Sequence, residues 1–357
     1  MKILGLLCKS TIKTRHATLF IRIFAGIFGD NIKMDKLQLI RKPVERELEE
    51  LKQMWHATMQ STDPMMNTVL EYIKRKPGKL MRPVLMLLIA KLVGKVSKAT
   101  YHASLAMELL HTASLLHDDV VDESGERRGM PSVNATFNNK IAVLGGDFVL
   151  ATSLMQAVKT EDMRIVGIVS SLGQLLAEGE ILQLENIGNS DFSEDVYYEV
   201  VRKKTASLFA ACAQAGALSA GANDDAAETA RNFGELLGIA FQIKDDIFDY
   251  YDSDALGKPT GNDMKEGKLT LPALYLLNNK PEKENTELAK KIKSLEASDE
   301  EIRHVIDKAK ECGGIEYARR AMNEYRNRAV ELLPKSADQD VVDALTAYVD
   351  YVVEREK

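Results

Sequence analysis

Cysteine is scarce in this sequence, and neither sign of charge dominates it. Three cysteines, Cys8, Cys212 and Cys312, occur in 357 residues, and their spacing matches neither a disulfide framework nor a zinc site. We therefore expect free thiols and a cytoplasmic protein. Lys and Arg number 47 against 53 Asp and Glu, a formal net charge of −6. This balance argues against a protein that binds nucleic acid with its whole surface.

The sequence also lacks a Ser/Pro-rich linker, a repeat of solenoid period and an evident transmembrane run. The apolar run at 19–28 is too short to cross a bilayer, and no clear small-residue cleavage site accompanies it, which excludes a transmembrane helix and a secretory signal there. It lies in a basic segment, residues 1–33, which as an amphipathic segment could touch a membrane surface. We favour the alternative that this segment does not belong to the native protein and that a single domain, residues 34–357, begins at Met34.

Between Asp35 and Lys357 the apolar residues recur at helical spacing, and no convincing alternating strand is present. Turn formers such as Pro77-Gly78 and Gly313-Gly314 separate the helical segments. The pattern predicts an all-α single-domain bundle of about 12–13 helices. The expected helices are 36–60, 63–76, 80–95, 98–122, 132–158, 161–188, 193–221, 223–253, 268–279, 283–296, 299–312, 314–333 and 338–355.

Two aspartate clusters carry the strongest chemical signal. The first is Asp118, Asp119 and Asp122, and the second is Asp245, Asp246 and Asp249; each follows an apolar helical stretch. Spacing of four residues places the outer two aspartates of each cluster on one helical face. Adjacent carboxylates in an apolar setting repel each other and are costly to desolvate unless a cation lies between them. Hard oxygen donors of this kind suit Mg²⁺, which completes its shell with water and phosphate oxygens.

Polar or small residues extend the faces of both clusters. His111 and Ser114 share the face of Asp118, and Gln242 shares that of Asp245. Helix bundles build their sites from such facing stripes. We therefore expect His111 to line a cleft rather than to be an ordinary core histidine.

Cations occur at several points near these clusters. They are Lys79 and Arg82 at a helix start, Arg127 and Arg128 after the first cluster, Lys204 beside Thr205, and Lys258 and Lys268 in a glycine-rich loop at 256–268. A flexible glycine-rich backbone next to lysines is suited to cover a phosphate. Taken singly, each cation is typical of a solvated surface. Together they predict sites for two diphosphates beside the metal-binding clusters.

In combination these motifs resemble the trans-polyprenyl diphosphate synthases. The resemblance rests on residues 78–83, 111–122, 127–129, 145–147, 204–205, 241–249 and 257–263, in this order. It spans most of residues 70–275 and does not include the first 33 residues. It implies an isoprenoid synthase-like bundle around a central cleft, a homodimer, and a prenyltransferase that condenses isopentenyl diphosphate onto an allylic diphosphate.

The resemblance also implies roles for individual positions. The six aspartates, Asp118, Asp119, Asp122, Asp245, Asp246 and Asp249, bind Mg²⁺, three ions in each site, which bridge to the allylic diphosphate. Isopentenyl diphosphate is expected at Lys79, Arg82, His111 and Arg128. The allylic diphosphate is expected at Arg127, Lys204, Thr205, Gln242, Lys258 and Lys268.

The product length depends on the residues one turn before the first cluster. Ala113 and Ser114 are both small, so they leave room for a growing chain. The helix before Asp118 has about twenty residues and spans ~30 Å, enough for roughly six isoprene units of ~5 Å. This indicates a C30–C50 product, such as a precursor of quinone side chains, whose apolar tail could bring the enzyme to a membrane. Met107 or Phe148 could instead close the channel early and give farnesyl or geranylgeranyl diphosphate.

Other classes of protein fit less well. A ferritin-like di-iron protein needs two Glu-x-x-His pairs; Glu108 with His111 and Glu301 with His304 match this spacing, but the second pair lies on a charged face. A class I terpene cyclase would carry a different second motif. A non-catalytic partner subunit would be expected to have lost one cluster, and both are intact here.

Overall fold

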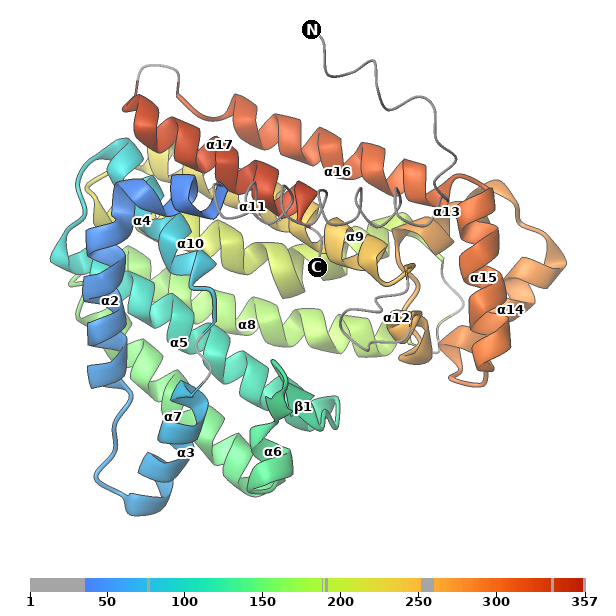
Figure 1. Cartoon of the computed structure of the whole chain (residues 1–357), viewed down its shortest axis with the longest axis horizontal. Coiled ribbons are helices and arrows are strands. Elements are labelled where there is room, and N and C mark those ends of the chain that lie inside the picture. The colour runs from blue at the N-terminus through green and yellow to red at the C-terminus, as the bar shows by residue number, and fades with distance from the viewer. Residues whose placement is uncertain are drawn as a thin grey trace, which may run out of the picture.

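The structure is a computed structural model that describes residues 36–75, 78–187, 189, 192–251, 260–334 and 337–355. Lys258 and the 1–33 segment lie outside these residues. The described chain is almost wholly helical, as the apolar spacing predicts (Figure 1). Cys212 and Cys312 are free thiols, as expected.

Helices of the N-terminal half surround the first aspartate cluster. After a helical stretch at 36–41 come η1 (Lys42–Val44), α2 (Glu45–Thr58), α3 (Pro64–Lys74), α4 (Met81–Val93), α5 (Lys98–Val121), α6 (Val133–Thr136), α7 (Asn139–Val158) and α8 (Met163–Asn186). Between α5 and α6, the two-residue strands β1 (Glu126–Arg127) and β2 (Met130–Pro131) pair in an antiparallel hairpin.

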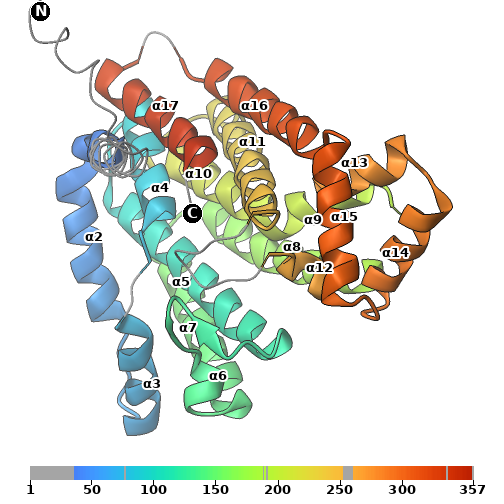
Figure 2. The same cartoon turned by 45° about the vertical axis from the view of Figure 1, so that its right-hand side comes forward.

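Helices of the C-terminal half carry the second cluster. They are α9 (Glu194–Val201), the π turn η2 (Arg202–Ala206), α10 (Ser207–Ser219), α11 (Asp224–Phe248), α12 (Asn262–Lys265), α13 (Leu271–Asn279), α14 (Lys283–Lys293), α15 (Asp299–Glu311), α16 (Gly314–Glu331) and α17 (Gln339–Glu354). Figure 2 shows α16 and α17 lying over α11, with α14 and α15 at one end of the bundle.

Helix α10 is the centre of the bundle and contacts α4, α5, α8 and α11. Its alanine-rich sequence is buried on nearly every side, and small residues allow the neighbouring backbones to come close. A Cβ on Gly216 of α10 would lie 2.8 Å from the Met86 carbonyl oxygen of α4, and one on Gly234 of α11 would lie 2.4 Å from that of Phe209. Larger residues at these two positions would push the helices apart.

Three expected features differ from the structure. The helix expected at 36–60 contains a 3₁₀ turn at Lys42–Val44, because Pro43 has no N–H to continue an α-helix. The helix expected at 132–158 is broken after α6, where Asn138 has a φ of 145° and its side chain caps α7. The turn expected near Gly129 is a two-residue hairpin turn that joins β1 to β2. Its residues, Arg128 and Gly129, have φ of 54° and 71°.

Helices α7 and α8 are each long and apolar enough to cross a membrane, judged by length and composition alone. Both belong to the bundle: α7 packs along α5, and α8 packs against α10 and η2. Each has one apolar face that no described helix covers. On α7 this face includes Leu144, Met155 and Val158, and on α8 it includes Met163 and Ile181.

Candidate active site

The two aspartate clusters lie at the C-terminal ends of the long helices α5 and α11. Ser97 starts α5 with a capping box, and Asn223 caps α11; each helix then runs for more than five turns before its cluster. Backbone carbonyls at a helix C-terminus make it partly negative, so carboxylates there are less stable than elsewhere. The clusters therefore need positive charge from other elements.

Lys204 and Lys268 supply positive charge to the first cluster and line a cavity that reaches the second. Lys204, in the π turn, attracts the carboxylates of Asp118 and Asp122, and Lys268 attracts those of Asp122 and Asp263. Both lysines also line one cavity of about 190 Å³ that contains Asp246 of the second cluster. The two clusters thus face a common site across these lysines.

Burial raises the pKa of the carboxylates in this site. The pKa of Asp118 rises to about 6, first because of desolvation, with Glu180 and Asp122 adding to the rise and Lys204 opposing it. Burial also raises the pKa of Asp122 and of Asp245. Charged carboxylates here lack enough compensation from the protein alone, which is the condition under which a divalent cation binds.

The donor set fits Mg²⁺ that is shared with a ligand. Within the part of the chain that the structure describes, no three Asp, Glu, His or Cys side chains meet closely enough to hold a metal ion alone. Mg²⁺ commonly takes one or two protein carboxylates and completes its shell with phosphate oxygens and water. The arrangement of the aspartates is compatible with this mode.

The second cluster is held by hydrogen bonds from three elements. Asp246 is only 3% exposed and accepts a hydrogen bond from Tyr197 Oη at 2.6 Å and one from Gln242 Nε2 at 2.8 Å. Thr205 Oγ1 donates to Gln242 Oε1 at 2.7 Å. Burial raises the pKa of Asp246 to about 7, while the bonds from Tyr197 and Gln242 oppose that rise.

The π turn that carries Lys204 and Thr205 explains how both reach the site. Gly179 of α8 lies against this turn: a Cβ there would be 2.9 Å from the backbone nitrogen of Lys204. Lys204 also pairs with Glu180 of α8. A single extra residue per turn is a common device at functional sites, and nothing in the helical periodicity of residues 193–221 indicates it.

Asp249 connects the second cluster to α12, which contains Asp263. Both oxygens of Asp249 accept hydrogen bonds, at 3.0 Å, from the backbone amides of Asn262 and Asp263. Desolvation, together with the charges of Asp246 and Asp249, raises the pKa of Asp263 well above its usual range. Asp263 is therefore a further acidic residue of the site, which the sequence analysis treated only as part of a motif.

Asp119 differs from the other five aspartates. It is 2% exposed, and its Oδ1 accepts a hydrogen bond from Arg127 Nε of the hairpin at 2.8 Å. The side chain of Asn134 donates to its backbone oxygen at 3.0 Å. The Asp119 carboxylate thus anchors the hairpin that carries Arg127 and Arg128.

A second group of cations surrounds a cavity of about 350 Å³ beside the first site. Lys79, Arg82, Arg128 and Arg355 line it, together with Phe241. The buried Nε of Arg82 has no hydrogen-bond partner among the described residues. A cavity lined by four cations is suited to bind an anion. Three of these cations, Lys79, Arg82 and Arg128, are residues expected to bind isopentenyl diphosphate.

His111 and Glu108 lie next to these cations on α5. Burial first, and then the charges of Arg82 and Arg128, hold the pKa of His111 well below its usual range. Burial raises the pKa of Glu108, and the same two arginines oppose the rise. The neutral imidazole and the buried carboxyl limit the net charge of the site until an anion binds.

Arg355, at the end of α17, is a site residue that the sequence analysis missed. Its Nη2 donates to Asp245 Oδ1 at 2.7 Å and to the carbonyl oxygen of Phe241 at 3.1 Å. Its guanidinium lies 4.0 Å from the centre of the Phe241 ring. Arg355 thus links the second aspartate cluster to the cationic cavity, and only packing across 110 residues of sequence places it there.

The two residues expected to control chain length have different surroundings. Ala113 is 2% exposed and packs in a core cluster with Trp55, Leu109 and Val149. Ser114 is half-buried, and its hydroxyl donates to the carbonyl oxygen of His111 at 3.0 Å. Phe148 is also half-buried, whereas Met107 is fully buried.

Known proteins share both the sequence and this arrangement. The sequence model of the polyprenyl synthetase family matches residues 63–309. The chain belongs to the polyprenyl synthetase family. It is accordingly a polyprenyl diphosphate synthase, a transferase of prenyl groups, and its helical bundle has the fold of that family.

Three relatives illustrate the range of the family. Octaprenyl diphosphate synthase of Escherichia coli (strain K12) is 34% identical over 82% of this chain and 91% of its own. A geranylgeranyl pyrophosphate synthase structure from Bacteroides thetaiotaomicron is 49% identical, with a TM-score of 0.79 over 90% of this chain and all of its own. A decaprenyl diphosphate synthase structure from Rhodobacter capsulatus is 34% identical, with a TM-score of 0.83 over 89% and 99%.

Membership of the family removes the di-iron alternative. His304 is exposed and lies 3.6 Å from Glu284 of α14, so the second Glu-x-x-His pair is on the surface, as its charged neighbours indicate.

Proposed function

We propose that this prenyltransferase makes a C30–C50 all-trans polyprenyl diphosphate from isopentenyl diphosphate and an allylic diphosphate, with three Mg²⁺ in each site. The observation that carries the reaction is the position of Lys204 and Lys268 beside the carboxylates of the first cluster and in one cavity with Asp246 of the second, next to the cavity of Lys79, Arg82 and Arg128. One diphosphate fits each of these two places.

The residues divide the chemistry between the two places. Lys204, Lys268 and Arg127 stabilise the negative charge that builds on the allylic diphosphate as its C–O bond breaks. The aspartates would hold Mg²⁺, which when bound would supply additional positive charge to that leaving group. Lys79, Arg82 and Arg128 bind the diphosphate of isopentenyl diphosphate and position its double bond next to the allylic carbon.

Bond formation then needs no side chain to act as a nucleophile. The double bond of isopentenyl diphosphate supplies the electron pair for the new C–C bond, and the resulting cation loses a proton, which the departing diphosphate accepts. Apolar walls keep water from the cation. Leu115 and Leu116, which turn toward the hairpin from α5, form part of these walls.

We base the proposed product length on the space along α5 before Asp118. Helix α5 has 24 residues, a length of about 36 Å, and Ser114 is small where an aromatic side chain would block a growing tail. The long-chain octaprenyl and decaprenyl synthases among the relatives support this length. The 49% identical geranylgeranyl pyrophosphate synthase favours a second candidate, a C20 product.

Chain-length analysis separates these two candidates. The purified protein, started at Met34, is incubated with Mg²⁺, labelled isopentenyl diphosphate and farnesyl diphosphate, and the products are dephosphorylated and sized. We expect a ladder that ends between C30 and C50. Products no longer than C20 would support a prenyltransferase but refute the long-chain proposal. If the folded protein incorporates no labelled isopentenyl diphosphate, the proposed reaction itself is refuted.

The same proposal includes a homodimer in the cytoplasm. The exposed apolar faces of α7 and α8 support an interface between two copies, because a contiguous apolar surface of this kind is usually covered by a partner. The apolar product is proposed to bring the enzyme to a membrane surface.

A further inference from the structure

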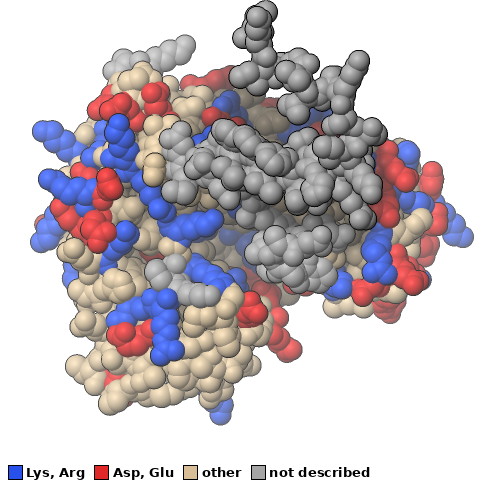
Figure 3. All heavy atoms as spheres, in the orientation of Figure 1, with Lys and Arg blue, Asp and Glu red and all other residues tan. Residues whose placement is uncertain are grey.

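Lys293, the last residue of α14, is the one buried lysine in the described part of the chain. Lysines normally extend into water, and Figure 3 shows Lys and Arg side chains spread over the surface. Lys293 is instead only 3% exposed, and its Nζ lies 5.4 Å from the centre of the Phe192 ring. A buried ammonium is costly unless hydrogen bonds compensate it, so the groups that it binds indicate its role.

The ammonium of Lys293 donates a hydrogen bond to Asn186, the last residue of α8. Its Nζ lies 2.9 Å from Asn186 Oδ1. An ammonium has only donors, so the amide must turn its oxygen toward Lys293. The Nδ2 group lies on the other branch of the same amide and therefore points away from Lys293. The hydrogen bond thus fixes which way round the amide of Asn186 is.

Asn186 also lines the cavity in which the allylic diphosphate is proposed to bind. The same cavity contains Lys204, Lys268 and Asp246. Asn186 Nδ2 makes no hydrogen bond to another residue that the structure describes, and Asn186 is half-buried. Its two N–H donors are therefore available to a ligand in this cavity.

The end of α14 packs against the loop next to Lys268 as well. Gly267, with a φ of 76°, has no room for a larger residue: a Cβ there would lie 3.0 Å from Ile187 Cγ2 and 3.1 Å from Leu295 Cδ2. Residues just after α8 and just after α14 therefore meet at the backbone that carries Lys268. This close packing holds Lys293 in place relative to the cavity.

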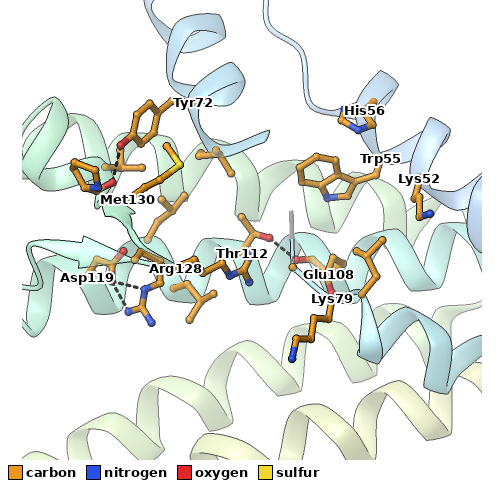
Figure 4. A pocket seen from close by; sticks show the side chains of 18 of the residues that line it. Lys52, Trp55, His56, Tyr72, Lys79, Glu108, Thr112, Asp119, Arg128 and Met130 are labelled. Carbon is orange, nitrogen blue, oxygen red and sulfur yellow. Dashed lines mark hydrogen bonds and ion pairs between the residues drawn. The ribbon is translucent and has the colours of Figure 1, made fainter. Parts of the chain in front are cut away.

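The first cluster contains a different kind of fixed side chain. Figure 4 shows Asp119 bonded to the hairpin, where its carboxylate accepts from Arg127 Nε. A carboxylate has acceptors only, so this bond spends on an anchor the atoms that a ligand could use. An amide has both kinds of group. The bond from Lys293 occupies the acceptor of Asn186 and leaves its donors for a ligand.

We propose that Asn186 donates a hydrogen bond to the allylic diphosphate and that Lys293 is the positioning residue that turns the Asn186 amide toward this ligand. The inference rests on the proposed place of the allylic diphosphate beside Lys204 and Lys268. Lys293 acts on the substrate without touching it. Loss of one hydrogen bond to a charged group lowers affinity by about tenfold to a hundredfold.

Two variants test the two residues separately. Asn186→Asp keeps an oxygen for Lys293 and replaces the Nδ2 donor by an acceptor, so the contact that supports folding remains while the bond to the ligand is lost. Lys293→Met keeps a long unbranched side chain and removes the donor that orients the amide. Lys290→Met is the matched control, because Lys290 is an exposed residue of the same helix.

Binding to the full chain is measured by calorimetry with Mg²⁺ and geranyl thiolodiphosphate, an allylic analogue whose bridging sulfur resists ionisation. We expect Asn186→Asp and Lys293→Met each to weaken its affinity at least tenfold, and Lys290→Met to leave it unchanged. Asn186→Asp should also unfold at or above the wild-type temperature in EDTA, which excludes a loss through misfolding. Wild-type affinity in either folded variant would overturn the inference.

A double-mutant cycle separates positioning from a purely structural role. The variant that combines Asn186→Ala with Lys293→Met should bind the analogue no more weakly than Asn186→Ala alone, because Lys293 acts through the amide. Lys293→Gln keeps a donor for Asn186 Oδ1 and should recover most of the affinity that Lys293→Met loses. Additive losses, or no recovery in Lys293→Gln, would indicate lost packing and contradict the inference.

Steady-state kinetics distinguish failure of this inference from failure of the proposed function. Asn186→Asp and Lys293→Met should raise the KM for the allylic diphosphate and leave the KM for isopentenyl diphosphate near the wild-type value. Equal rises in both KM values would refute a role at the allylic diphosphate. A wild-type protein that turns over but does not bind the thiolodiphosphate in competition with the allylic substrate would instead refute the proposed place of that substrate.

Discussion

Replacing Asp118 by asparagine should stabilise the protein when no metal is present and abolish most of its activity. The pKa of this carboxyl is raised to about 6 from 3.8, chiefly by desolvation. The folded state therefore binds the proton more tightly than the unfolded state. Stability contributed by this group is present at low pH and is lost as pH rises toward and through 6.

The magnitude follows from the size of that shift. A rise from 3.8 to about 6 corresponds to ~3 kcal/mol at pH 7.5, since one pKa unit is 1.36 kcal/mol. Asp118 is half-buried, so solvent screening reduces the cost to about 1–2 kcal/mol. For a chain of this size Asp118→Asn should raise the melting temperature by about 1–3 °C.

Thermal unfolding in EDTA measures this difference directly. We expect Asp118→Asn to melt above wild type at pH 7.5, and the gap to narrow as the pH falls toward 5. Adding Mg²⁺ with inorganic diphosphate should reverse the order, because only wild type keeps the full cluster. A variant that melts below wild type in EDTA at pH 7.5, or a gap independent of pH, would refute the reasoning.

Three further changes test other parts of the site. Tyr197→Phe removes the hydrogen bond that opposes the raised pKa of Asp246, so the acidic limb of the kcat–pH profile should move to higher pH; an unshifted profile would contradict this role. Ser114→Phe should shorten the product by several isoprene units in chain-length analysis, and an unchanged length would place the channel elsewhere. Met155→Glu, on the exposed face of α7, should produce monomers in light scattering, whereas an intact dimer would rule out that face.

The sequence was sufficient to predict the bundle and the placement of both clusters. Apolar residues at helical spacing determine which face of a helix is buried, and the four-residue spacing of Asp118 and Asp122 needs only helical geometry. Pro43 and Asn138 interrupt two expected helices, since local backbone chemistry at those points overrides the apolar pattern.

Other parts of the site depend on packing between distant segments. Tyr197 resembles an ordinary core aromatic in the sequence, and Arg355 resembles a surface residue at a chain end. Both acquire a role only because α9 and α17 lie against α11. The π turn at Lys204 likewise has no signature in the periodicity, because the alanine-rich helix that follows is buried on nearly every side and has no single apolar face whose shift would reveal the extra residue.

The central claim is that both aspartate clusters act together on one diphosphate. The most direct test compares incorporation of labelled isopentenyl diphosphate by wild type, Asp118→Asn, Asp245→Asn and the surface control Asp343→Asn, all confirmed to be folded. We predict a loss of at least a hundredfold for each of the two cluster variants and wild-type activity for the control. Near-normal turnover by either cluster variant would contradict the account.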